Sequence, residues 1–415
     1  MRFLKGAFIF VFVACLGFVL ALWAQKKTTD YRLELERIEE DLCREKSNGT
    51  SAASSEKAIG LIYLEYLKAS LTGSMEDFAG TKRAVDRAIG DFGSVPELYL
   101  VRANLNFKFH RIADAKSDLE RLSDPDQPPG VRLLSADIKL QEGQYEEAEQ
   151  GYLRAIEEKR TWDGLARLAY LRSIMGEVDS AETLYAEALD EITAKEMRSY
   201  AWVELQRGLL DLRHGRHDEA LAHYRHADKA YSGYWLVEEH IAELMGAARR
   251  FEEAVALYGE LIARTGKPEL EQTLGDLYFY MGQPDRAKPW HEKALAAYLE
   301  SVQRGEVQYF HHLATFYADM RQDGAEAVKW ARRDLELRRN FATHDALAWA
   351  LYRDGRFAEA EDEMNAALAS GVEDAHLFFH AAMVYLAAGR TDQGRQFLKK
   401  AAEVNPRYES FHVHR

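Results

Sequence analysis

The chain has 415 residues, of which 47% are hydrophobic and 29% are charged, a balance typical of a folded protein and not of a disordered one. Its net charge of −14 argues against nucleic-acid binding, which needs a basic face, and its eight prolines leave room for long helices. With two cysteines, Cys15 and Cys43, a disulfide framework or a cysteine-based zinc site is not expected.

An uncharged run covers residues 6–24 and follows Arg2 and Lys5. As a helix it would reach about 28 Å, close to the thickness of the bilayer's hydrocarbon core. We therefore predict that residues 1–27 hold a retained membrane anchor, with the rest of the chain outside the cytoplasm, most simply in a bacterial periplasm. The alternative is a cleaved signal and an exported soluble protein, although the best cleavage motif, Leu22 to Ala24, lacks a small first residue.

Residues 28–55 follow as a juxtamembrane helix and a Ser-rich linker. The helix, around residues 30–46, carries apolar residues at 4-3-4 spacing: Tyr31, Leu35, Ile38 and Leu42. Two heptads are too few for a stable coiled coil, so a solvated spacer is the prediction. Weak self-association through residues 31–43 is the alternative.

Residues 274–298 predict a helical hairpin. Leu274, Leu277, Tyr278 and Met281 form one apolar helix face, and a turn rich in Gly and Pro precedes a second helix. Gly275 and Ala287 are both small and lie twelve residues apart, one on each helix. Small residues let two helices approach closely, so this pair marks their contact.

The same pair of small residues recurs along the chain. Its other copies are Ala103/Ala115, Ala136/Ala148, Ala169/Ala181, Gly208/Ala220, Ala242/Ala254, Ala348/Ala360, Ala382/Gly394 and, with one extra residue, Ala314/Ala327. Successive second members lie 33, 33, 39, 34, 33, 40, 33 and 34 residues apart. The two long intervals predict extra turns near residues 190–200 and 298–307.

A period near 34 with one helical hairpin per period resembles the tetratricopeptide repeat family, over residues 96–406. The resemblance implies an all-α fold, a right-handed α-solenoid of about nine such hairpins behind the N-terminal membrane or signal helix. Residues 56–95 resemble a degenerate capping hairpin, and residues 407–415 form a C-terminal tail. The sequence departs from the family where its first-helix aromatic is replaced, at Arg132, Glu204 and Glu271, and where the closing proline survives only as Pro406.

The resemblance also implies a function. Proteins of this family are non-enzymatic scaffolds that bind a partner peptide or protein on a concave face lined by the first helix of each repeat. The corresponding residues here are acidic in the middle of the array and rich in aromatics and histidines towards its end: Glu239, Glu243, Glu269, Gln272, Asp276, His311, Asp345, Trp349, Tyr352, His376 and Phe379. The expected partner carries basic and aromatic or apolar side chains. The alternative is that these carboxylates are solvated and the aromatics pack between repeats.

Fourteen histidines raise the question of a metal site. His376 and His380 are one helical turn apart, and His311, His312 and Asp345 lie on the two preceding repeats, so a metal-binding module at these C-terminal histidines is an alternative function. A second group, His214, His217, His223 and His226, straddles a turn and a second helix. Neither group carries a known metal or catalytic signature, so the prediction is no metal, no cofactor and no enzymatic activity.

Overall fold

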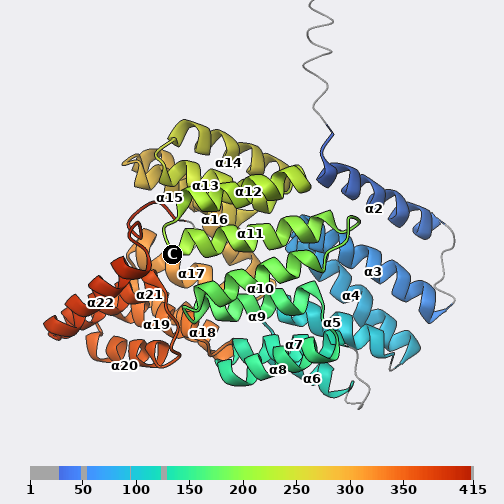
Figure 1. The fold of residues 1–415 in the computed structure, drawn as a ribbon, viewed down its shortest axis with the longest axis horizontal. Helices are drawn as coiled ribbons and strands as arrows, with labels where there is room; N and C mark the ends of the chain where they lie inside the picture. The colour runs from blue at the N-terminus through green and yellow to red at the C-terminus, as the bar shows by residue number, and fades with distance from the viewer. Residues whose placement is uncertain (1–27, 48–53, 94, 123–128, 413–415) are drawn as a thin grey trace, which may run out of the picture.

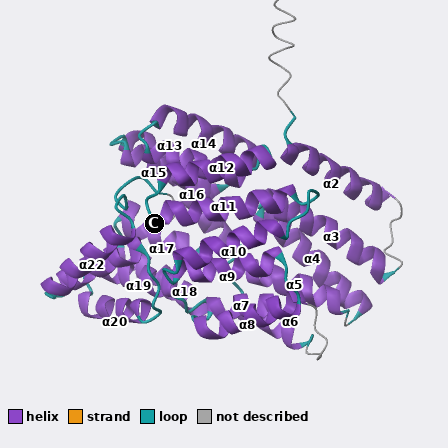
Figure 2. Ribbon diagram, viewed as in Figure 1, coloured by secondary structure: helices purple, strands orange, loops and turns teal. Residues whose placement is uncertain are grey.

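A computed structural model describes residues 28–47, 54–93, 95–122 and 129–412, and every regular element within them is a helix (Figures 1 and 2). The predicted membrane segment 6–24 and most of the Ser-rich linker lie outside the described residues. None of the described helices is long and apolar enough to cross a membrane.

The helices form antiparallel pairs that follow one another along the chain. Helix α2 (Asp30–Ser47) precedes the hairpin of α3 (Ser55–Thr72) and α4 (Met75–Phe92). Nine further hairpins follow: α5 (Pro96–Lys108) with α6 (Ile112–Glu120), α7 (Pro129–Gln141) with α8 (Tyr145–Glu158), α9 (Trp162–Ile174) with α10 (Val178–Asp190), α11 (Met197–Arg213) with α12 (His217–Ala230), α13 (Trp235–Ala247) with α14 (Phe251–Thr265), α15 (Pro268–Tyr280) with α16 (Pro284–Gln303), α17 (Phe310–Phe316) with α18 (Gly324–Leu337), α19 (Phe341–Arg353) with α20 (Phe357–Leu368), and α21 (Ala375–Ala387) with α22 (Thr391–Val404). The prediction of an all-α solenoid of about nine hairpins is confirmed.

The small residues of the repeat lie where the two helices of a hairpin meet. A Cβ atom added to Gly208 would overlap the ring of Tyr224, and one added to Gly275 would overlap the ring of His291. Both rings come four residues after the second small residue of their repeat. The spacing of the small residues therefore indicates where a ring of the second helix packs directly on the backbone of the first helix.

The irregular intervals also have structural causes. The extra residue in the Ala314/Ala327 pair is accommodated by a π-helical turn, η1 (Tyr317–Arg321), which continues α17 and ends at Gln322 with φ 52°. The interval of 40 residues contains the lengthened α16, and the interval of 39 contains the loop 191–196 and the lengthened α11.

The solenoid winds so tightly that its second superhelical turn lies on its first (Figure 1). Backbone N–H groups donate across the two turns, from Tyr31 to Ser232 O (3.1 Å), from Arg339 to Gln141 O (3.0 Å) and from Glu373 to Ile174 O (2.9 Å). These partners are about 200 residues apart, the length of six repeats. One superhelical turn therefore takes about six hairpins.

Helix α2 differs from the prediction for it. Tyr31, Ile38 and Leu42 are buried in a cluster with residues of α11, α12 and α13. The Tyr231 hydroxyl donates a hydrogen bond of 2.5 Å to Glu34 of α2. The expectation of a solvated spacer, or of self-association through this face, is wrong, because the 4-3-4 residues bury their apolar surface against the protein's own solenoid.

Candidate binding groove

The acidic part of the predicted groove is formed by Glu239 and Glu243 of α13 and Glu269 of α15. Only 6% of Glu239 is exposed, and Glu243 is fully buried. Burial, together with the charges of Glu243 and Glu269, raises the pKa of Glu239 to about 7. Among the described residues, none donates a hydrogen bond to the buried Oε2 atom of Glu269. Glu239 is therefore protonated below about pH 7, and the negative charge of this part of the groove is carried by its neighbours.

Glu243 is held by two histidines. His240 Nδ1 lies 2.8 Å from one carboxylate oxygen, and His412 Nδ1 contacts the other. Burial by itself would raise the pKa of Glu243, but His412 and His240 outweigh it and hold that pKa well below its usual range. Glu243 is thus an ionised carboxylate that joins the middle of the solenoid to the end of the chain.

The next predicted residues are paired within their own hairpins. Gln272 accepts a hydrogen bond of 2.9 Å from the Tyr298 hydroxyl, and Asp276 lies 2.8 Å from His291 Nε2. Farther along, His311 Nδ1 lies 3.2 Å from Asp334. For these residues the packing alternative describes the structure better than a free binding surface does.

The aromatic end of the groove is centred on Trp349. Its ring stacks on Tyr352 at 4.9 Å and on His380 at 4.1 Å between ring centroids. The His380 imidazole is also held by Asp345, with both carboxylate oxygens 3.0 Å from Nδ1. The Trp349 indole N–H donates to Asp319 at 2.9 Å. Trp349 is therefore packed within the protein, as the packing alternative expects, and its part in binding a partner stays a prediction.

Residues 405–412, called here the C-terminal segment, lie in this groove. Tyr408 packs on Phe379 at 5.9 Å, and the His412 ring stacks on His376 at 5.2 Å. Phe411 is only 3% exposed, and a Cβ atom added to Gly246 would come within 2.7 Å of its ring. The segment thus contacts Phe379 and His376 of α21 and, through His412, Glu243 in the acidic part.

Sequence reasoning did not assign any role to the C-terminal segment. Its composition nevertheless indicates that it could occupy the groove. It contains the basic and aromatic residue types expected of a partner: Arg407, Tyr408, Phe411 and His412. A search for that chemistry within the chain itself would have found it.

The C-terminal histidines do not form the metal-binding module considered as an alternative. His380 is engaged by Asp345 and Trp349, His376 stacks on His412, and His311 faces Asp334. His312 packs against Tyr298 and Tyr309, and burial lowers its pKa to about 4. That alternative is wrong for these residues, because each imidazole has a different neighbour.

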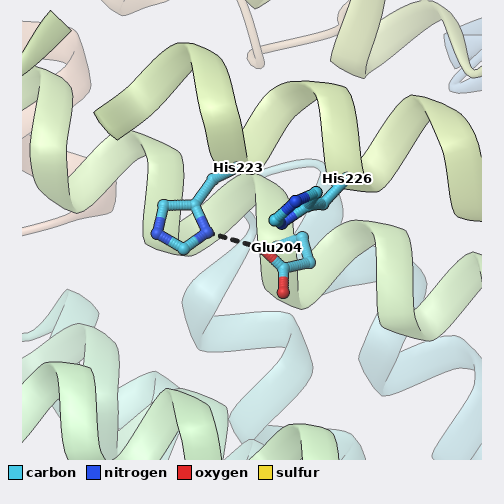
Figure 3. Close-up of side chains that lie close together, drawn as sticks. All are labelled: Glu204, His223 and His226. Carbon is cyan, nitrogen blue, oxygen red and sulfur yellow. Dashed lines mark hydrogen bonds and ion pairs between the residues drawn. The ribbon is translucent and has the colours of Figure 1, made fainter. Parts of the chain in front are cut away.

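Within the described residues, one group of three side chains has donor atoms close enough to hold a metal ion: Glu204 of α11 with His223 and His226 of α12 (Figure 3). Both histidines belong to the second group considered above, whereas Glu204 was considered only as a departure from the family pattern, and no metal was predicted there. Glu204 replaces an aromatic residue of the family pattern, which is the signal that something other than apolar packing occurs at this position.

Replacing Glu239 with Gln should make the stability of the protein depend less on pH between about 4.5 and 7. The folded Glu239 keeps its proton up to about pH 7, whereas in the unfolded chain it ionises near 4.5, so stability falls as the pH rises through this interval. The variant cannot ionise there, and at pH 8 it should gain up to about 3 kcal/mol over the original protein. Urea unfolding at pH 5 and pH 8 measures this. The control Glu260→Gln, an exposed residue of α14, should show no such gain, and an equal gain in both variants would contradict the assignment.

Comparison with known proteins gives the following matches. Residues 346–408, which contain most of α19 and all of α20 to α22, match the tetratricopeptide repeat family. A solved structure, a tetratricopeptide repeat protein from Parabacteroides merdae ATCC 43184, is 20% identical over 59% of this chain and 93% of that chain, with a TM-score of 0.36. No curated protein matches. The match to the tetratricopeptide repeat family thus covers the last two hairpins, and the seven hairpins before them are helix pairs that follow one another in the same order along the chain.

Proposed function

We propose that this protein is a non-enzymatic scaffold whose groove binds a basic, aromatic segment of a partner protein. The observation that carries the proposal is the seating of the protein's own C-terminal segment there. His412 contacts the buried Glu243, and Phe411 fills the space beside Gly246. A partner with the same chemistry would meet a carboxylate for its basic group and a pocket for its ring.

The C-terminal segment acts in this proposal as an internal ligand. Because it is attached to the solenoid, its effective concentration at the groove is high, and a partner has to displace it. Binding is then gated by the release of residues 405–412 and not by a rearrangement of the helices. Tyr408 lies on Phe379 and His412 on His376, so their release would uncover two ring faces for the partner.

A synthetic peptide of residues 405–415, carrying a fluorophore, tests the proposal when it is titrated into the full-length protein. In the variant Phe411→Ala the internal segment loses its anchor, and truncating a buried phenylalanine costs about 3 kcal/mol or more. The peptide should therefore bind this variant about 100-fold more tightly than the original protein. Fluorescence anisotropy measures the affinity.

Two further variants define the site in the same assay. Adding Glu243→Gln to Phe411→Ala should weaken peptide binding again, because the imidazole of the peptide loses its carboxylate. Phe279→Ala removes a half-exposed phenylalanine of α15 and should leave the affinity of the original protein unchanged. Equal peptide affinity with and without Phe411 would refute the internal-ligand proposal.

We further propose that residues 6–24 tether the solenoid to a membrane, with the repeats outside the cytoplasm, because this uncharged run has the length of a bilayer core. The alternative is an exported, soluble assembly factor. Carbonate extraction of native membranes distinguishes them, since a tethered protein stays in the membrane pellet.

A further inference from the structure

A compact group of metal-ligating atoms lies on the hairpin of α11 and α12, formed by Glu204, His223 and His226 (Figure 3). The two histidines are three residues apart and face the glutamate from one side of α12. One ligand atom from each of the three residues lies within 4.8 Å of the other two. The His223 Nδ1 atom is 2.6 Å from Glu204 Oε2.

These atoms suit a tetrahedral zinc ion. Zinc binds imidazole nitrogen and carboxylate oxygen at about 2.0–2.2 Å, so two ligand atoms of a tetrahedral site lie about 3.4 Å apart. The pair formed by Glu204 and His223 would open by less than about 1 Å to admit the ion. Glu204 is buried, whereas His226 is exposed, so the site has a fixed inner side and an open outer side.

A second carboxylate lies near the ring of His223, on the side away from Glu204. The second ring nitrogen of His223 lies 3.6 Å from Asp211 Oδ2, and the other oxygen of Asp211 is held by Arg216 at 2.7 Å. A carboxylate behind a ligating histidine fixes the tautomer and raises the basicity of the ring. The remaining oxygen of Glu204 faces Arg207 at 3.3 Å, which leaves Oε2 for a ligand.

Another hairpin has the same pair without the third ligand. His344 of α19 and Glu363 of α20 occupy the two positions that Glu204 and His223 occupy in their repeat, with the residue types exchanged, and lie 2.7 Å apart. The residue three beyond Glu363, which corresponds to His226, is Ala366. An imidazole–carboxylate pair is therefore a recurring packing feature, and the additional histidine is what distinguishes the hairpin of α11 and α12.

We propose that Glu204, His223 and His226 bind one Zn²⁺ ion, with a water molecule as the fourth ligand. The ion would link the two helices of this hairpin and leave an exchangeable position at the protein surface. The C-terminal segment also touches this hairpin, where the Asn405 side chain donates to Leu212 O at 3.4 Å, but the three proposed ligands all come from α11 and α12. The zinc proposal does not depend on the function proposed for the groove.

Calorimetric titration of zinc into the full-length protein, stripped with a chelator and made without a histidine tag, tests the proposal. We expect the variant His226→Ala to lose at least about tenfold in zinc affinity, because the remaining pair offers only two ligands. His344→Ala is the matched control and should bind zinc as the original protein does. Since His226 is exposed, its removal should leave the helical circular dichroism intact.

The absorption spectrum of bound cobalt provides a second, independent test of the site. Cobalt bound in place of zinc should give the visible absorption of a tetrahedral site in the original protein and in His344→Ala, but not in His226→Ala. Asp211→Asn should weaken zinc binding about tenfold without removing a ligand. Equal zinc affinity in the original protein and His226→Ala, or a cobalt spectrum that His226→Ala leaves unchanged, would overturn the proposal.

Discussion

Replacing Gly143 with Ala should destabilise the protein by about 3 kcal/mol and loosen the contact between its two superhelical turns. Gly143 has φ 75°, a left-handed conformation that costs an L-residue about 1 kcal/mol. In addition, the new methyl group would overlap the backbone carbonyl oxygen of Arg339, which comes from the next superhelical turn. The turns can relieve this overlap only by separating, with loss of the hydrogen bond from Arg339 N–H to Gln141 O.

Gly282→Ala is the matched control for this prediction. Gly282 ends a first helix in the same way, with φ 73°, but an added Cβ would meet nothing within 4 Å. It should cost only about 1 kcal/mol. Urea unfolding compares the two variants, and small-angle X-ray scattering should show a larger radius of gyration for Gly143→Ala alone. Equal losses of stability would mean that the contact between the turns contributes nothing.

The substitution Gly208→Ala should also destabilise the protein, by about 2–3 kcal/mol. Gly208 lies inside α11, and an added Cβ would overlap the ring of Tyr224, which is fully buried and cannot move away. Overpacking of this kind forces the backbone or the ring out of position. The hairpin of α11 and α12 would therefore have to widen.

For Gly259→Ala, on the neighbouring hairpin, we expect the opposite result, a gain in stability. Gly259 lies inside α14, and an added Cβ would meet nothing within 4 Å. Alanine in an open helical position should stabilise the protein by about 0.5–1 kcal/mol. Thermal or urea unfolding of both variants measures the pair. A loss of stability in both, or in neither, would show that the small residue of the repeat does not mark a close helix contact.

The recurrent small residues were sufficient to predict the fold, because their spacing reports a contact inside each hairpin. The same spacing places a second contact in each hairpin. It joins the residue four positions before the small residue of the first helix to the residue three positions after the small residue of the second helix. In two repeats aromatic rings meet there, Phe310 with Trp330 at 5.6 Å and Phe378 with Phe397 at 5.8 Å. In the repeat of Gly208 the same two positions hold Glu204 and His223. Glu204, which departs from the family pattern, therefore forms a polar pair with His223 where other hairpins have an apolar pair.

The closed superhelix could not be predicted in this way. Its pitch results from small rotations that accumulate over about six hairpins, and the contacts that close it join residues about 200 positions apart. The position of the C-terminal segment follows from the same closure, because α13 meets Phe411 and His412 only when the second superhelical turn lies on the first. The groove residues were identified by repeat position, but their occupant depends on this long-range geometry.

Photochemical cross-linking from residue 411 tests the central claim most directly. Phe411 is replaced with p-azidophenylalanine in the full-length protein, and the cross-linked peptides are mapped by mass spectrometry after irradiation. Because Phe411 lies against Gly246 of α13 and near Tyr280 of α15, the account predicts intramolecular cross-links to these two helices, lost when a large excess of the peptide of residues 405–415 is added. Cross-links to other helices, or none within the same chain, would contradict it.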